Sequence, residues 1–181
     1  MTSAADIPES THTLAECNVQ YLEQGAALLT ELSDAEYGEP LLPAFSQGIG
    51  PHVRHIIDHY TTFLNGVSSG RVDYDVRERD PRMETNRDAA IARLLALAAQ
   101  LRRLPDGEGD RMLEVIIDCG NGDAQARQPT RSSVARELQF LLSHTVHHYA
   151  LLAAALTLRG KAVPTELGMA PSTLRYQKST Q

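Results

Sequence analysis

The sequence predicts an all-α protein built as a four-helix bundle, with a small β-hairpin expected between the third and fourth helices. Two observations lead to this fold class. Apolar residues recur at helical spacing in four separate stretches, and glycines or prolines stand near the ends of those stretches. The first and third connections are long, which permits parallel neighbouring helices, so a simple up-down-up-down order is not required.

The first helix is expected over residues 13–32. Thr13 is followed three residues later by Glu16, which fits a capping box. Residues 34–50 contain two prolines and three glycines and should form a connecting loop. The second helix is expected over 50–66, where Pro51 occupies a favourable first helical position and Gly66 marks the end.

The third helix is expected over residues 85–104, with Thr85 and Asn86 available to cap it. The β-branched run from Met112 to Asp118 is then followed by the turn sequence Gly-Asn-Gly-Asp at 120–123, which predicts a hairpin or an extended crossover.

The fourth helix is expected over residues 133–159, where Gly160 and Pro164 stop it. Residues 161–181 should form a tail draped over the bundle. A chain of 181 residues is long enough for one domain with a core of its own, so residues 1–181 are expected to form a single domain.

Composition excludes several classes of protein. A hydrophobic content of 42% with 22% charged residues is ordinary for a globular domain, and the net charge of -6 argues against nucleic acid as the main partner. No apolar run reaches the roughly 18 residues of a membrane span, and the N-terminus has no secretory signal pattern. Two distant cysteines, Cys17 and Cys119, suit a reducing compartment, so we expect a soluble cytoplasmic protein.

Histidines supply the main functional signal. The chain has seven, and six of them fall into two short clusters. On a helix that advances about 100° per residue, His144 and His148 point about 40° apart and share the apolar stripe of the fourth helix with Leu141 and Leu152. Imidazoles in such a stripe are costly unless their nitrogens find partners.

The second cluster is formed by His52, His55 and His59, which lie within about 60° of one another on the second helix. A histidine pair at positions i and i+4, joined by one histidine from a facing helix, suits zinc, nickel, iron or manganese. Three ligands would leave open positions for water or substrate, as in catalytic sites. The residue after His144 is Thr145 rather than glutamate, so a His-Glu-x-x-His peptidase is disfavoured.

These patterns together resemble a known family. Pro51-His-Val-Arg-His-Ile-Ile-Asp-His-Tyr60 and Ser143-His-Thr-Val-His-His-Tyr149 look like the motifs of the DinB/YfiT-like metalloenzymes. The resemblance implies an up-down-down-up bundle, a divalent metal ion held by His55, His144 and His148, and a homodimer. Some relatives are thiol-dependent S-transferases, so it also implies a small-molecule substrate such as a low-molecular-weight thiol.

Other residues have open alternatives. His52 and His59 are either substitute or supporting ligands or solvent-facing residues, and His147 is expected to be exposed or interhelical. Glu137 lies two turns before His144 on the same face, where it could orient an imidazole, act as a base or pair with an arginine. Asp58 could form a surface pair with Arg54 one turn away.

Two further features have open alternatives, and two others have a single interpretation. The charged segment 71–80 is either an internally paired run or an arginine site for a substrate anion. Cys119 is either a reactive thiol or a packing residue. The stretch Pro171-Ser-Thr-Leu-Arg-Tyr176 reads as a packed turn, and His12 as a surface residue.

Two main functional hypotheses follow. The first is an enzyme whose metal acts as a Lewis acid on a thiol or water, with Glu137 as a supporting residue or base. The second is a non-catalytic dimeric module that binds a small ligand or a metal. Metal storage or sensing is a third hypothesis, disfavoured because this acidic chain has no basic face for nucleic acid.

Overall fold

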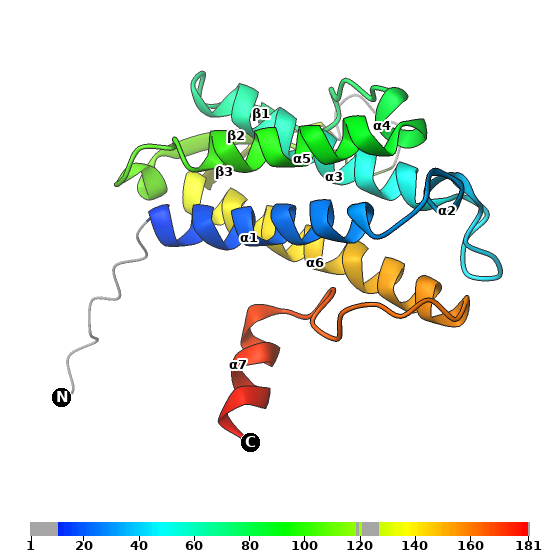
Figure 1. Ribbon diagram of the computed structural model, residues 1–181. Coiled ribbons are helices and arrows are strands. Elements are labelled where there is room, and N and C mark those ends of the chain that lie inside the picture. Colours follow the sequence, from blue (N-terminus) through cyan, green and yellow to red (C-terminus); the bar gives the residue numbers. More distant parts are fainter. Residues whose placement is uncertain (1–10, 119, 121–126, 181) are drawn as a thin grey trace.

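The computed structural model describes residues 11–118, 120 and 127–180. This part of the chain is mostly helical, in agreement with the predicted class, but it also contains a sheet of three strands. Four long helices dominate it (Figure 1). They are α1 (Thr11–Thr30), α3 (Ile49–Val67), α5 (Arg87–Leu101) and α6 (Val134–Leu158).

All four long helices lie where the sequence predicts them, with ends displaced by at most about three residues, within the usual uncertainty of helix boundaries. Thr13 lies inside α1, so its predicted role as a cap is wrong. Asn86 does cap α5 by accepting a hydrogen bond from the backbone N–H of Ala89, and the hydroxyl of Ser133 caps α6 in the same way.

The long helices pack side by side. Helix α1 contacts α5 and α6, and α3 contacts the same two helices. Figure 1 shows that α1 and α6 run in one direction while α3 and α5 run in the other. This arrangement brings the histidines of α3 within reach of those of α6.

A polar network lies inside the apolar core between these helices. The hydroxyl of Tyr60 donates to Oδ1 of Asn18 at 2.7 Å, and the amide nitrogen of Asn18 donates to the carbonyl of Leu138 at 3.0 Å. Thr145 joins the network through Tyr60, at 3.2 Å. Asn18, Tyr60 and Thr145 are all fully buried, so each needs these partners.

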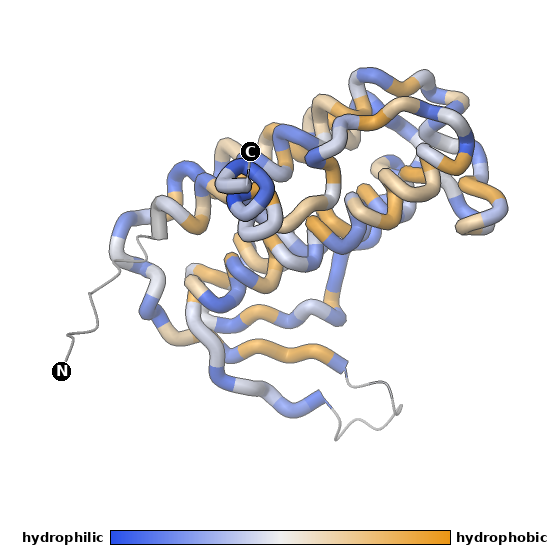
Figure 2. Tube along the Cα trace, turned by 90° about the horizontal axis from the view of Figure 1, so that it is seen from below, coloured by the Kyte–Doolittle hydropathy of each residue, from blue (hydrophilic) through white to orange (hydrophobic). Residues whose placement is uncertain are grey.

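The sheet is larger than the predicted hairpin. Strand β2 (Met112–Ile116) pairs antiparallel with β3 (Thr130–Ser133), as a hairpin would, and parallel with β1 (Arg71–Asp73), which places Val72 beside Val115. In Figure 2 the three strands lie side by side at one edge of the helices, and the central strand is the most hydrophobic. The predicted turn at 120–123 lies mostly outside the described residues.

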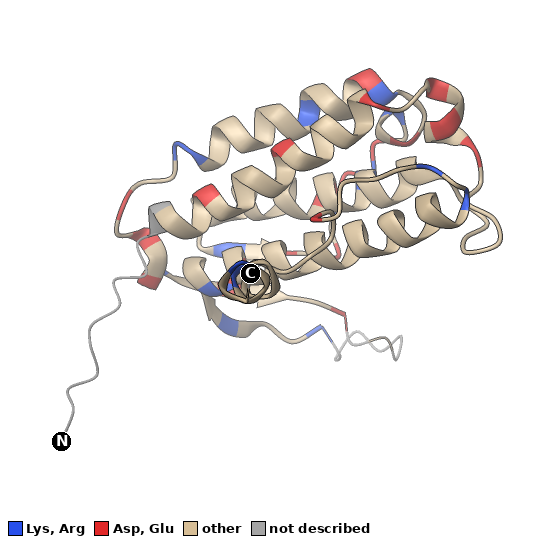
Figure 3. Ribbon diagram, turned by 60° about the horizontal axis from the view of Figure 1, so that its bottom comes forward, with Lys and Arg blue, Asp and Glu red and all other residues tan. Residues whose placement is uncertain are grey.

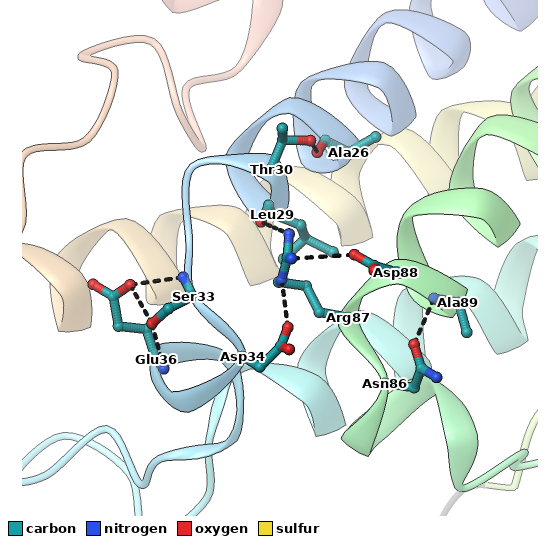
Figure 4. Close-up of polar contacts among 10 residues, drawn as sticks. All are labelled: Ala26, Leu29, Thr30, Ser33, Asp34, Glu36, Asn86, Arg87, Asp88 and Ala89. Atoms are coloured by element: carbon teal, nitrogen blue, oxygen red, sulfur yellow. Dashed lines mark hydrogen bonds and ion pairs between the residues drawn. The ribbon is translucent and has the colours of Figure 1, made fainter.

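Two short helices lie in the connections between the long helices: α2 (Asp34–Gly38), within the stretch that was expected to be a loop, and α4 (Arg82–Thr85). Helix α2 begins with a capping box in which Ser33 and Glu36 exchange hydrogen bonds (Figure 4). Nearby, the Arg87 guanidinium bonds to the carbonyl of Leu29 at 3.1 Å and to Asp34 at 2.8 Å, which ties the end of α1 to the start of α5 (Figure 4).

The tail begins by packing on the helices, as predicted. Leu167 is buried, and the Tyr21 hydroxyl donates to the carbonyl of Met169 at 2.5 Å. Residues Pro171–Ser179 then form helix α7, which has no buried residue, so the packed turn expected there is wrong. A single-turn 3-10 helix, η1 (Glu108–Asp110), precedes β2.

Candidate metal centre

The two histidine clusters meet between α3 and α6. His55 from α3 lies with its ring centroid 4.8 Å from that of His144 and 4.9 Å from that of His148, both from α6. From residue 138 to residue 158, α6 carries no Lys, Arg, Asp or Glu, so the cluster lies on a neutral stretch of helix (Figure 3).

One nitrogen from each of these three rings points to a common centre. Nε2 of His144 lies 3.1 Å from Nε2 of His55 and 3.2 Å from Nε2 of His148. Around a tetrahedral ion with metal–nitrogen bonds of about 2.05 Å, two ligand nitrogens lie roughly 3.3 Å apart. The two separations measured from Nε2 of His144 are close to that value. Among the described residues, these three histidines form a group that could hold a metal ion, with their donor atoms all within 4.8 Å of one another.

The second nitrogens of the three rings have different surroundings. Nδ1 of His148 lies 3.1 Å from Nδ1 of His52, and Nδ1 of His55 lies 3.2 Å from Nη1 of Arg77. Nδ1 of His144 is buried and has no hydrogen-bond partner among the described residues. His52 therefore contacts the second nitrogen of His148, the one that does not face the common centre. This is the position expected of a residue that supports a metal ligand.

His59 also borders the centre. Its side chain is buried, so the solvent-facing alternative is wrong for this residue. Nδ1 of His59 bonds to the carbonyl of His55 at 2.8 Å, and its ring centroid lies 4.3 Å from that of His144. His147 is exposed on α6, as one of its two predicted alternatives has it, and its ring centroid lies 5.4 Å from that of His148.

The electrostatic state of the rings suits a metal. Burial, followed by the charges of neighbouring histidines, lowers the pKa to about 2 for His55, to about 4 for His144 and to about 3 for His148. The rings are thus neutral near pH 7, and neutral imidazole is the form that binds metal ions.

Glu137 lies further along α6 and is buried. Its carboxylate accepts hydrogen bonds from the hydroxyl of Tyr74 at 2.9 Å and from that of Ser132. Burial and the Glu137 carboxylate raise the pKa of Tyr74, which keeps the phenol protonated as a donor. The ring of Tyr74 stacks on His59 with centroids 5.4 Å apart, so Glu137 reaches the histidine cluster through Tyr74.

The sequence did not predict that Glu137 reaches the histidine cluster through Tyr74, because segment 71–80 has the pattern of a run of charged residues. The sequence does indicate a strand here, since Val72 and Tyr74 alternate with charged residues. The ion pairs that this run makes among the described residues reach outside it, because Asp80 binds Arg82 at 2.7 Å and Asp73 binds Arg127 at 2.9 Å. The expected internal pairing is therefore wrong for these two carboxylates.

Asp58 pairs with Arg54 at 3.2 Å, as predicted, but it is buried instead of lying at the surface. Thr145 points into the core network and not toward the converging nitrogens. Cys119 and the side chain of His12 lie outside the described residues.

A comparison with models of protein families shows which family the chain belongs to. Residues 23–152 match the model of the DinB superfamily. The chain belongs to the DinB superfamily. The matched segment includes all three converging histidines of this DinB-like chain.

One curated relative is FK506-binding protein 5 of the fungus Rhizopus delemar, which is 32% identical over 107 residues. The match covers 59% of this chain but only 28% of the relative's length. No solved structure matches the chain. In the part of the chain that the structure describes, no helix is long and apolar enough to cross a membrane.

Proposed function

We propose that this DinB-like chain is a metal-dependent enzyme in which His55, His144 and His148 hold one divalent ion, either zinc, nickel, iron or manganese. The observation that carries the proposal is the convergence of three Nε2 atoms at 3.1 and 3.2 Å. The proposal includes the up-down-down-up four-helix bundle as the scaffold, a homodimer as the assembly and a small thiol as the preferred substrate.

The donor set suits catalysis better than a purely structural ion. Three neutral ligands leave at least one coordination position open, whereas structural zinc sites are closed by four protein ligands. When bound, the ion supplies Lewis acidity that lowers the pKa of a thiol or a water at the site. All three rings are half-buried, which leaves a route for a substrate from solvent.

The neighbouring residues would hold the ligand rings in place. His52 fixes the ring of His148 through the contact between their Nδ1 atoms, and Phe140 stacks on His144 with an interplanar angle of 16°. Glu137 acts as a positioning residue, because its carboxylate holds Tyr74 against His59.

An activity assay with matched variants tests the proposal. Chelator-stripped protein is loaded with each of the four metals and assayed for thiol transfer to an electrophile and for ester hydrolysis. We expect turnover with at least one metal, loss of that turnover in His55→Ala and His144→Ala, and full activity in His147→Ala. The last variant is the control, because His147 is an exposed histidine on the same helix. Turnover that survives in His144→Ala, or no turnover with any metal, would overturn the proposal.

A further inference from the structure

Arg77 is the positively charged residue that contacts the histidine centre. Its Nη1 lies 3.2 Å from Nδ1 of His55, and its Nε is buried without a hydrogen-bond partner. Among the described residues, no carboxylate oxygen lies within 4.0 Å of its guanidinium nitrogens. A half-buried guanidinium with unused donors is unusual, because buried charges are normally paired.

The loop that carries Arg77 is fixed against α3. The backbone N–H of Arg79 donates to the buried carboxylate of Asp58. Arg79 has a φ of 52°, a left-handed conformation that residues other than glycine seldom adopt without a compensating contact. At the start of the loop, Arg127 binds Asp73 at 2.9 Å and Asp75 at 3.3 Å. These anchors hold Arg77 beside His55.

The contact between Arg77 and His55 conflicts with a metal ion on His55. A guanidinium only donates hydrogen bonds, so Nδ1 of His55 must accept and carries no proton, which places the ring proton on Nε2. A metal ion on Nε2 requires the opposite tautomer, with the proton on Nδ1. A metal ion held by Nε2 of His55 would therefore break the contact with Arg77 and would leave its guanidinium free at the edge of the centre.

A freed guanidinium beside a divalent cation is a binding site for an anion. Its planar fork matches the two oxygens of a carboxylate, and one guanidinium balances one negative charge. We propose that Arg77 binds a carboxylate of the substrate, so that the preferred substrate carries both a thiol for the metal and a carboxylate for Arg77. This inference rests on the proposed function of the histidine centre.

Cobalt provides the first test, because its absorption spectrum reports occupancy without any turnover. Arg77→Gln should bind Co²⁺ about tenfold more tightly than the parent, since the competing hydrogen bond and the repelling charge are gone. Arg79→Gln removes the same charge from an exposed side chain of the same loop and should change the affinity far less. Equal cobalt affinity in the parent and in Arg77→Gln would overturn the competition between Arg77 and the metal.

Two thiols then test the preference for a carboxylate. Mercaptoacetate carries a carboxylate where 2-mercaptoethanol carries a hydroxymethyl group. Each thiol is titrated into the cobalt-loaded protein. The parent and Arg79→Gln should prefer mercaptoacetate by about tenfold, while Arg77→Gln should lose most of that preference. A preference that is absent from the parent, or that survives in Arg77→Gln, overturns the inference and leaves the metal site standing. A chain that binds no cobalt overturns the proposed function and this inference together.

Discussion

His55 and His144 place their Nε2 atoms 3.1 Å apart although they are separated by 89 positions in the sequence. Two neutral imidazoles can share one proton at this distance, but Nε2 of His148 lies 3.2 Å from the same atom of His144. A shared proton satisfies one such contact and not both, whereas a metal ion satisfies all three nitrogens at once. The low pKa values of the three rings act in the same direction.

The buried network around Asn18 should be a main source of stability. Asn18→Ala removes the acceptor for Tyr60 and the donor to Leu138, so we expect the free energy of unfolding to fall by about 2–3 kcal/mol. Urea unfolding followed by circular dichroism measures the change. Asn65→Ala, on the exposed side of α3, is the control and should have little effect. A loss below about 0.5 kcal/mol in Asn18→Ala would contradict the assigned role of the network.

Gly50 should resist any larger side chain. A Cβ at this position would lie 2.0 Å from the backbone oxygen of Glu84, so the start of α3 or the α4 turn must move. We expect Gly50→Ala to lower the free energy of unfolding by roughly 1–3 kcal/mol. Gly38→Ala provides the matched control, because no atom lies within 4 Å of its added Cβ. Thermal unfolding of the two variants compares them directly, and equal melting temperatures would refute the close approach.

Glu137 should matter more for stability than for metal content. Glu137→Ala leaves the buried Tyr74 hydroxyl without its acceptor, which should cost about 1–3 kcal/mol of unfolding free energy. Metal content should remain at the parent's level, because the described hydrogen bonds of the carboxylate go to hydroxyl groups and not to an imidazole. Loss of the metal from a folded Glu137→Ala protein would show that the carboxylate orients a ligand directly.

Acid should weaken the capping box of α2. Hydrogen bonds from Lys161 and from the backbone and hydroxyl of Ser33 lower the pKa of Glu36 from 4.5 to about 2. Because the folded-state pKa is the lower one, these contacts stabilise the protein fully above pH 4.5 and progressively less as the pH falls toward 2. The stability difference between the parent and Glu36→Gln should therefore shrink over that range in urea titrations. A difference that does not change with pH would contradict the assignment.

The long helices could be predicted because their signal is local. Apolar spacing and the caps at Asn86 and Ser133 lie within the segments themselves. The helical phase of His55, His144 and His148 also allowed the site to be proposed, with the family resemblance selecting His55 from its cluster.

The features that the sequence did not predict depend on contacts between distant segments. Strand β1 has three residues and forms because Val72 pairs with Val115, a partner that the local sequence does not reveal. The position of Arg77 likewise depends on the hydrogen bond between Arg79 and Asp58, which no local spacing encodes. The capping box of Ser33 and Glu36, in contrast, was visible in the sequence and was missed.

Metal content tests the central claim most directly. Untagged protein purified without chelator is analysed for zinc, nickel, iron and manganese, beside His55→Ala, His144→Ala and the exposed control His147→Ala. The account predicts about one ion per chain in the parent and in the control, and little in the two ligand variants. A folded parent that contains no metal and takes up none of the four, or ligand variants that retain the parent's metal, would contradict it.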